Sequence, residues 1–301
     1  MANDYSKKRV IVRFFCYDAA MKDNTSVNNQ VNTSLSAPRV MVITGAASGL
    51  GQALAINAAS SGYAVAVADV QDDAGLETVE RIKKMDLDAA YFHCNVGDSQ
   101  ALSSLKDQVI KHFGYVDVLV NNAGVGSQGY LENTTEAEWE RQWQINLMGV
   151  VRGCQAFIPE LRKRSEASIV NVASFAAIAL APGVASYNVV KAGVHALSET
   201  LRCELAADKI GVSVVCPAFF QTNLTDSMLG TDEKVKSQIN RWMKRSKYTA
   251  DDVAQMILSA IDKQQFMVLC DSQTKWQYRI SRWFPNYFFK QKLKMIKRMF
   301  Q

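Results

Sequence analysis

Cysteine and histidine are scarce in this chain, and both are scattered. The 301 residues include six cysteines and three histidines, and no two cysteines have the CxxC spacing of a zinc site or a redox motif. Disulfide-rich and zinc-stabilised folds need clusters of these residues. The sequence therefore predicts neither a disulfide framework nor a metal site.

Long apolar runs are also lacking. No run approaches the roughly 18 residues that a membrane-spanning helix needs. The apolar stretch 10–16 is interrupted by Arg13 and is not followed by a small-residue cleavage site, so it does not resemble a secretory signal. We therefore expect a cytoplasmic protein.

Acidic residues are missing from the C-terminal end. Residues 275–301 contain eight lysines and arginines and no aspartate or glutamate. The whole chain carries a formal net charge of +5, so residues 1–274 carry −3. Nucleic-acid-binding proteins usually spread basic residues over a recognition face. The body of this chain offers no such face, and we expect no nucleic-acid partner.

The chain does contain a regular alternation of short apolar runs and segments of helical periodicity. The apolar runs predict strands at 39–44, 64–68, 89–94, 117–120, 168–172 and 212–216. The segments between them predict helices at 50–61, 73–85, 99–113, 135–163 and 186–208. Strands that are apolar throughout are typical of a parallel sheet covered by helices on both faces. With right-handed crossovers, this pattern predicts an α/β fold with a doubly wound parallel sheet, the Rossmann fold.

Three segments differ from this regular pattern. Residues 1–37 are polar and rich in Asn and Ser, and we expect a weakly ordered leader. The single Rossmann-fold domain is predicted over 38–270, with a less regular insertion at 218–247 before a helix at 249–263 and a last strand at 266–269. Residues 271–301 form a basic, aromatic, amphipathic tail.

A glycine-rich turn lies where the first predicted strand meets the first predicted helix. Glycines there permit a tight turn and a close approach of backbone N–H groups to a pyrophosphate at the helix N-terminus. Asp69 ends the second strand, where an acidic residue binds the ribose hydroxyls of a dinucleotide. Glycines at strand ends are often ordinary turn residues, but this context predicts a dinucleotide site. The turn residues concerned are Thr44, Gly45, Ser48, Gly49, Leu50 and Gly51.

The spacing of this turn, TGxxxGxG, resembles that of the short-chain dehydrogenase/reductase family. Further motifs of the family follow in the same order: NNAG at 121–124, the helix asparagine at Asn146, the serine at Ser174, YxxxK from Tyr187 to Lys191, and the proline–threonine loop at Pro217 and Thr222. The resemblance covers about 38–270. It implies an NAD(P)-dependent oxidoreductase that interconverts an alcohol and a carbonyl.

The resemblance also implies a set of cofactor contacts. Besides the turn, these are Asp69, Asn95, Val96, Asn122, Ala123, Gly124, Tyr187, Lys191, Pro217 and Thr222. Asn95 departs from the family, which has aspartate there, although an amide can still bind the adenine edge. The Asp69 carboxylate repels a 2′-phosphate, and neither Val70 nor Gln71 supplies a cation to bind one. NAD is therefore favoured, with NADP left open.

The predicted catalytic group centres on a tyrosine and a lysine. Oxidising an alcohol requires removal of its hydroxyl proton, and a tyrosine with a pKa near 10 is a poor base at neutral pH. Tyr187 and Lys191 are four residues apart, so on a helix they share one face. The lysine cation is expected to lower the tyrosine pKa and to hold the nicotinamide ribose. Ser174 would bind the substrate oxygen, and Asn146 resembles the asparagine that supports the proton relay of the family.

The substrate is predicted from the residues around this group. Segments 125–131, 175–183 and the insertion, expected as a substrate lid, carry many apolar side chains, which favour a lipophilic alcohol or ketone. Acyl-carrier-protein reductases of the family usually end in a glycine-rich segment, which is missing after 266–269, so that class is disfavoured. The apolar residues expected around the pocket are Phe175, Ile178, Leu180, Phe219, Phe220, Met228 and Leu229.

Two alternatives stay open at this point. The tail places Phe289, Leu293, Ile296 and Phe300 on one helical stripe among basic residues, which suits either an anionic membrane surface or packing on the body or a second subunit. The family pairs its long helices, so a homodimer or homotetramer is expected. A non-catalytic dinucleotide sensor or a membrane-docking scaffold on the same fold is the alternative function.

Overall fold

The computed structural model describes residues 37–220, 228, 230 and 233–299. The predicted leader, except for residue 37, and part of the insertion, including Thr222 and Leu229, lie outside the described residues. The residues from Pro38 onward form one compact unit.

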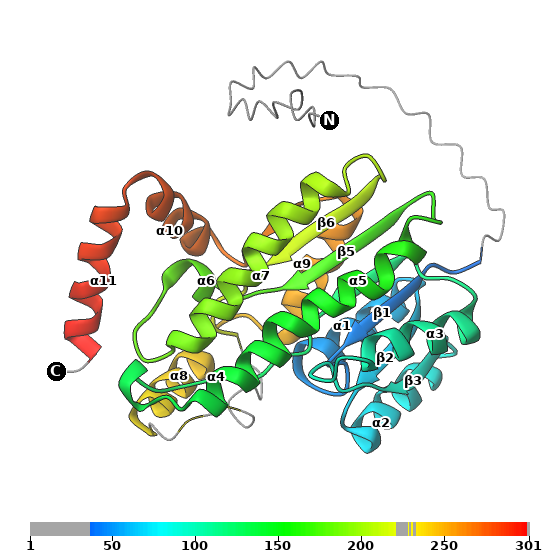
Figure 1. Ribbon diagram of the computed structural model, residues 1–301, viewed down its shortest axis with the longest axis horizontal. Helices are drawn as coiled ribbons and strands as arrows, with labels where there is room; N and C mark the ends of the chain where they lie inside the picture. The colour runs from blue at the N-terminus through cyan, green and yellow to red at the C-terminus, as the bar shows by residue number, and fades with distance from the viewer. Residues whose placement is uncertain (1–36, 221–227, 229, 231–232, 300–301) are drawn as a thin grey trace, which may run out of the picture. The chain divides into compact units, whose positions relative to one another are not determined.

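Within the described residues, seven strands form one parallel sheet in the order β3-β2-β1-β4-β5-β6-β7 (Figure 1). The predicted doubly wound Rossmann fold is therefore confirmed. The strands are β1 Val40–Thr44, β2 Ala64–Asp69, β3 Ala89–His93, β4 Val118–Asn121, β5 Ala167–Val172, β6 Ile210–Val215 and β7 Met267–Val268.

Helices connect the strands and extend beyond the last one. The first half of the chain contributes α1 Gly49–Ser60, α2 Asp72–Lys83, α3 Ala101–Phe113, η1 Leu131–Asn133, α4 Glu136–Gln142, η2 Trp143–Met148 and α5 Gly149–Leu161. The second half contributes α6 Ala176–Ala179, α7 Ala185–Glu204, α8 Glu233–Arg245, α9 Ala250–Asp262, α10 Ser272–Trp283 and α11 Pro285–Met299. Among these described helices, none is both long enough and apolar enough to span a bilayer.

The sheet is covered on both faces because its strands present apolar side chains alternately to each side. Val42 of β1 belongs to the core shared with α3, α5 and α7, whereas Met41 and Ile43 belong to the core shared with α1, α2 and α9. Figure 1 shows α3, α5 and α7 crossing in front of the sheet and α1 and α9 behind it. Because both faces of the sheet are buried, polar residues do not alternate with apolar ones along the strands.

Two predicted elements differ in detail. The single helix predicted over 135–163 runs from α4 to α5 with a π-helical segment, η2, between them. A π-segment widens the helix by one residue per turn, and apolar periodicity does not report such a local change. The insertion predicted as irregular contains the helix α8.

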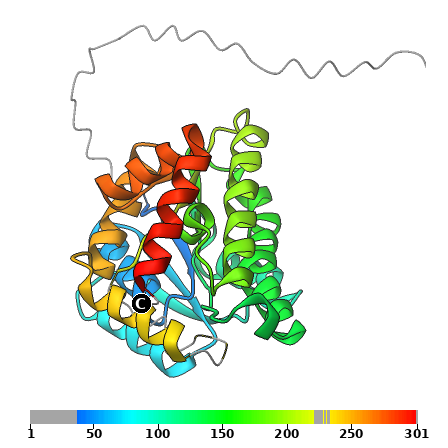
Figure 2. The same cartoon turned by 90° about the vertical axis from the view of Figure 1, so that its left-hand side faces the viewer.

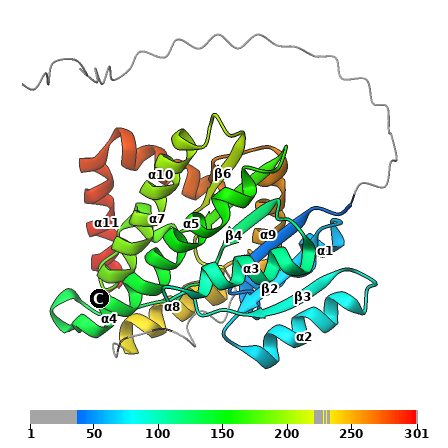
Figure 3. The ribbon, with the colours of Figure 1, turned by 45° about the vertical axis from the view of Figure 1, so that its right-hand side comes forward.

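The parallel strands all end at one edge of the sheet. β1 and β4 are neighbours there, and the chain leaves them toward opposite sides, which creates the crevice where such folds bind dinucleotides. Figures 1 and 3 place α4, α8 and the end of α11 at this same edge. The cofactor crevice and the segments that can cover it therefore lie together.

Candidate active site

A cavity of about 1940 Å³ opens at the carboxyl ends of the strands. Its walls include the residues that directly follow five of the strands, β1 to β5, and Pro217 in the loop after β6, together with residues of α8, α10 and α11. The predicted site residues that line it are Gly45, Ser48, Gly49, Leu50, Asp69, Asn95, Val96, Asn122, Ala123, Gly124, Ser174, Tyr187, Lys191 and Pro217. The topology thus brings together residues that are up to 172 positions apart in the sequence.

Thr44 and Gly51 shape the glycine turn without lining the cavity. The Thr44 hydroxyl accepts hydrogen bonds of 3.1 Å from the backbone N–H groups of Asn122 and Ala123. The Asn122 side chain donates in return to the carbonyls of Thr44, at 2.9 Å, and Gly45, at 3.0 Å. A Cβ on Gly51 would lie 2.0 Å from the Gly45 carbonyl oxygen. The turn is therefore tied to the end of β4, and only glycine fits at position 51.

The N-terminus of α1 faces this cavity. Ser48 is the N-cap residue, its side chain makes no capping hydrogen bond, and Gly49 and Leu50 follow it along the wall. The first N–H groups of a helix carry the positive end of its dipole and bind anions such as a pyrophosphate. Gly45 has a φ of +66°, which glycine adopts without strain. The turn therefore fits the dinucleotide that its sequence predicts.

Asp69 is held firmly at the end of β2. Its carboxylate accepts backbone hydrogen bonds from Ala47 at 2.9 Å, Val70 at 2.7 Å and Gln71 at 3.1 Å. The carboxylate is thus oriented before any ligand binds, and it also links β2 to the glycine turn. A fixed negative charge at this wall accepts hydrogen bonds from ribose hydroxyls and repels a phosphate.

The loop after β3 carries Asn95 and Val96 into the cavity wall. The Asn95 side-chain oxygen accepts a 3.1 Å hydrogen bond from the Gly97 N–H. Arg152 of α5 donates to the carbonyls of Val96, at 3.4 Å, and Gly97, at 3.2 Å. The departure from the family aspartate is therefore accommodated within an ordered loop.

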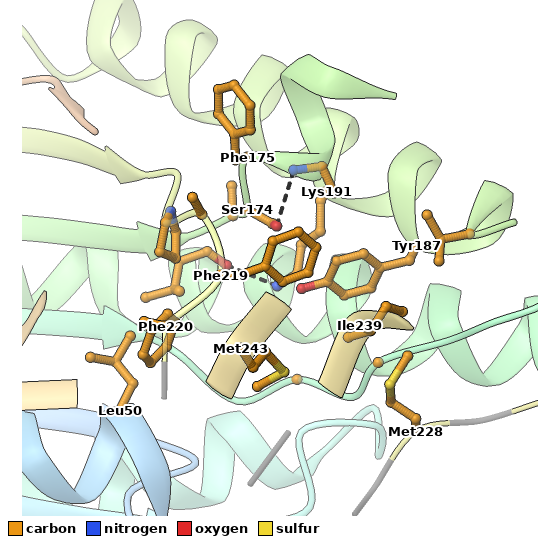
Figure 4. Close-up of a pocket in the computed structure, with 18 of the residues that line it drawn as sticks. Leu50, Ser174, Phe175, Tyr187, Lys191, Phe219, Phe220, Met228, Ile239 and Met243 are labelled. Carbon is orange, nitrogen blue, oxygen red and sulfur yellow. Dashed lines mark hydrogen bonds between the residues drawn. The ribbon is translucent and has the colours of Figure 1, made fainter. Parts of the chain in front are cut away.

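Ser174, Tyr187 and Lys191 lie together on one wall of the cavity (Figure 4). The Lys191 Nζ lies 5.8 Å from the centroid of the Tyr187 ring. It donates a 2.9 Å hydrogen bond to the Val172 carbonyl at the end of β5. The Ser174 hydroxyl accepts from the Ala176 N–H at 3.1 Å, which turns it toward the same space. β5 and α7 thus position the predicted catalytic side chains.

Burial has the largest effect on the pKa values of Tyr187 and Lys191. It raises the pKa of Tyr187, an effect that the Ser174 hydroxyl partly offsets. Burial lowers the pKa of Lys191 to about 8. The sequence predicts a lowered tyrosine pKa, and in this structure the net shift is upward. The reason is that desolvation of the phenol outweighs any attraction from a lysine whose ammonium is bound to the Val172 carbonyl.

Asn146 lies in η2 and is completely buried. Its side-chain oxygen accepts from the Val125 N–H at 2.9 Å, and its Nδ2 donates to the Val125 carbonyl at 2.8 Å. It does not line the cavity, but a Cβ on Gly124 would lie 2.7 Å from its Oδ1 and 3.5 Å from the Lys191 Nζ. Asn146 therefore stands directly behind the wall that Lys191 faces.

Gln142 is a residue of this site that the sequence did not identify. It is completely buried, its Nε2 donates to the Gly126 carbonyl at 2.9 Å, and its Oε1 accepts from the Asn146 side chain. It lies one helical turn before Asn146, but glutamine at that spacing is common on exposed helix faces. Only its complete burial, which the sequence does not show, distinguishes Gln142 from these exposed glutamines.

The far end of the cavity carries many apolar side chains, with polar residues of α8 and α10 among them. The predicted lining residues Phe175, Phe219, Phe220 and Met228 are present, and α8 adds Ile239 and Met243 (Figure 4). Trp242 of α8 also lines the cavity. Ile178 instead lines a separate groove of about 320 Å³, as does Leu180, which is mostly exposed. The tail also contributes Phe288 and Lys292 to the cavity wall, which the sequence did not predict.

Known proteins resemble this chain in sequence and in fold. The sequence model of the family described as short chain dehydrogenase matches residues 39–233. The 3-oxoacyl-[acyl-carrier-protein] reductase FabG of Staphylococcus aureus (strain N315) is 31% identical over 229 residues, which are 75% of this chain and 92% of FabG. A short-chain dehydrogenase/reductase from Burkholderia phymatum, solved in complex with NAD, is 31% identical, with a TM-score of 0.78, 81% coverage of this chain and 93% coverage of that one.

A longer relative matches over part of its length. The Probable oxidoreductase EphD of Mycobacterium tuberculosis (strain ATCC 25618 / H37Rv) is 32% identical over 253 residues, which are 81% of this chain. They are 43% of EphD, so this chain spans less than half the length of that relative. From the family match and the FabG likeness together, the chain belongs to the short-chain dehydrogenase/reductase family, whose members are NAD(P)-dependent oxidoreductases acting on CH–OH groups.

Proposed function

We propose that this protein interconverts a lipophilic alcohol and the corresponding ketone or aldehyde with NAD. The observation that carries the proposal is the convergence of Ser174, Tyr187 and Lys191 on one wall of a cavity with an apolar far end. The bound nicotinamide ring would supply or accept the hydride. The residues of the chain position the substrate and move the proton.

Tyr187 is the general acid and base of this proposal. Its phenol oxygen takes the hydroxyl proton of an alcohol, or returns it to a carbonyl oxygen. The Ser174 hydroxyl binds the same substrate oxygen and stabilises the charge that develops there. Lys191 holds the nicotinamide ribose, and Asn146 supports the proton relay behind it. Ser174 and Tyr187 line the same cavity, which supports a substrate oxygen shared between the two hydroxyls.

The cofactor preference follows from the wall after β2. The Asp69 carboxylate is fixed by three backbone N–H groups and is mostly buried. A 2′-phosphate placed against it would meet a like charge, with the apolar Val70 and the neutral Gln71 beside it. We therefore propose NAD as the preferred cofactor.

The substrate class follows from the far end of the cavity. Phe175, Phe219, Met228 and Met243 offer few hydrogen-bonding groups and much apolar surface. Apolar walls with a small number of polar groups at one end favour an amphiphilic molecule with its oxygen at Tyr187. β7 leads into α10, whose Thr274 and Gln277 line the cavity in place of a glycine-rich ending.

A homodimer or homotetramer is part of the proposal. Trp143 of η2 and Val189 of α7 are large apolar side chains that remain exposed in the single chain. They lie on the long helices that the family pairs between subunits. Burial of this surface in a second copy would remove it from water.

The test is a cofactor-coupled assay with secondary alcohols and ketones of graded chain length, run with NAD and with NADP. We expect Tyr187→Phe to lower kcat/KM by roughly 1000-fold, as loss of a general acid and base does, with NADH binding retained. Tyr63→Phe, a matched change at a buried tyrosine behind the sheet, should retain wild-type activity. NADH binding without conversion of any alcohol or ketone would favour the non-catalytic sensor instead.

A further inference from the structure

The tail leaves its apolar side chains uncovered. Phe288 and Lys292 line the active-site cavity, while Phe289, which is 55% exposed, and Leu293, 43% exposed, keep much of their surface open to solvent. Trp283 is 78% exposed at the corner between α10 and α11. We call the following set the tail surface: Trp276, Trp283, Phe284, Tyr287, Phe289 and Leu293. Figure 2 shows α10 and α11 lying along one side of the molecule, with α11 in front.

Basic residues surround the tail surface. Lys275, Arg279, Arg282, Lys290 and Lys294 are exposed, and no salt bridge between described residues engages any of them. Residues 272–299 contain no acidic side chain. Cations without an acidic partner beside exposed Trp, Tyr and Phe are complementary to an anionic lipid surface, where the rings reach the acyl boundary and the cations meet headgroups. Two tails facing each other would instead bring like charges together.

A separate groove lies between the tail surface and the active-site cavity. The groove is lined by Ile178 and Leu180 on one side and by Phe289 of the tail surface on the other. Phe288 and Lys292 line both this groove and the cavity, so they form the partition between the two. Lys292 is held there by a 3.0 Å hydrogen bond from its Nζ to the carbonyl oxygen of Ala179 at the end of α6.

We propose that the tail surface docks this protein on an anionic lipid membrane and that lipophilic substrates pass from the bilayer along the groove to Tyr187. The docking part is independent of the reaction, and the substrate route rests on the proposed function. A passing chain would meet Ile178, Leu180 and Phe289 before the partition. The hydrogen bond from Lys292 to the Ala179 carbonyl attaches this partition to α6.

Docking is tested by co-sedimentation of the full chain with vesicles of phosphatidylcholine, alone or with about one third phosphatidylglycerol. We expect binding to the anionic vesicles, a reduction of at least roughly tenfold in Trp283→Ser/Phe284→Ser, and loss of the anionic preference in Lys290→Glu/Lys294→Glu. The matched control is Leu76→Ser/Met85→Ser, which removes exposed apolar side chains from α2 and the turn after it and should bind like wild type. Figure 1 shows α2 and α11 at opposite ends of the sheet.

Two results would overturn docking. One is equal sedimentation of wild type and both tail variants. The other is a wild-type chain that does not bind vesicles, combined with a lower oligomeric mass of the tail variants in light scattering. The tail surface would then be a subunit interface.

The substrate route is tested by comparing a long-chain secondary alcohol dissolved in the anionic vesicles with a short, water-soluble one. We expect Trp283→Ser/Phe284→Ser to raise KM for the vesicle-borne alcohol about tenfold, with kcat and the short-alcohol kinetics unchanged. Unchanged kinetics for both alcohols would overturn the route. If no alcohol or ketone is converted at all, the proposed function fails, while the sedimentation result still decides docking.

Discussion

The Lys191 Nζ lies 5.8 Å from the centroid of the Tyr187 ring and donates its hydrogen bond to the Val172 carbonyl. Lys191 is only 3% exposed, and burial lowers its pKa from 10.5 to about 8. The fold therefore keeps a lysine cation in a place that disfavours the charge. Such a residue reduces stability in return for its position beside the reacting oxygen.

Replacing Lys191 with methionine should stabilise the ligand-free protein at pH 7 while removing activity. The depressed pKa means that the unfolded chain holds the proton more tightly, which below pH 8 costs the folded state up to about 3 kcal/mol. Loss of the hydrogen bond to Val172 offsets part of this, so we expect a gain of about 2 kcal/mol from urea unfolding.

The pH dependence separates this explanation from improved packing. The penalty is complete below the folded pKa of about 8, falls as the pH rises toward 10.5, and vanishes above it. The advantage of Lys191→Met over wild type should therefore shrink between pH 8 and pH 10.5. A difference in stability that stays constant across this interval would contradict the assignment.

Gln142→Leu should damage catalysis more than cofactor binding. Gln142 connects the Asn146 side chain to the backbone of the segment after β4, and leucine would leave the Gly126 carbonyl without this donor. We expect kcat to fall roughly 10- to 100-fold and the free energy of unfolding to fall by about 2 kcal/mol, as for loss of buried hydrogen bonds. NADH affinity, measured by fluorescence titration, should change little.

Gln108→Leu is the matched control, because Gln108 is exposed on α3 and bonds only to the nearby Ser104. It should leave kcat and stability near wild type. If the activity of Gln142→Leu falls only in proportion to its unfolded fraction, Gln142 has no positioning role.

The cofactor preference should respond to a change of charge after β2. Asp69→Ser combined with Val70→Arg removes the fixed carboxylate and adds a cation at an exposed position. We expect the ratio of kcat/KM for NADP over NAD to rise roughly 100-fold, with some loss of stability because Asp69 accepts three backbone hydrogen bonds. Asp72→Asn, which changes an exposed carboxylate nearby, should leave the ratio unchanged. A similar rise of this ratio in both variants would mean that the net charge of the protein, and not the position of Asp69, sets the cofactor preference.

Gly51→Ala should abolish cofactor binding and destabilise the fold. Its Cβ would lie 2.0 Å from the Gly45 carbonyl and 2.6 Å from the Asn122 side chain, so the glycine turn must move away from β4. Gly62→Ala is the control, because no atom lies within 4 Å of its Cβ and only its φ of +89° is strained. We expect the control to cost about 1 kcal/mol and to bind NADH normally. Normal NADH affinity in Gly51→Ala would remove the turn from the proposed cofactor site.

The sequence predicted the fold and most of the cavity wall because both depend on local patterns. Apolar runs separated by helical periodicity can satisfy burial only as a covered parallel sheet, and parallel strands bring their carboxyl ends to one edge. Gly45 and Ser174 follow strands that end at that edge, and Tyr187 lies in the first turn of α7. The direction of the Tyr187 pKa shift was not predictable, because it depends on how much water the folded walls exclude.

Other features were decided only by tertiary packing. Local periodicity locates a helix but does not report the π-segment at Trp143–Met148 or the burial of Gln142, the last residue of α4 before it. The sequence also identified the stripe of Phe289 and Leu293, but not which face of α11 the body covers. Packing selected Phe288 and Lys292 for contact and left the stripe exposed, because the neighbours of a helix are set by the whole fold rather than by its own residues. The sequence by itself therefore determined the Rossmann fold and its chemical motifs, and the tertiary structure decided how the tail meets the cavity.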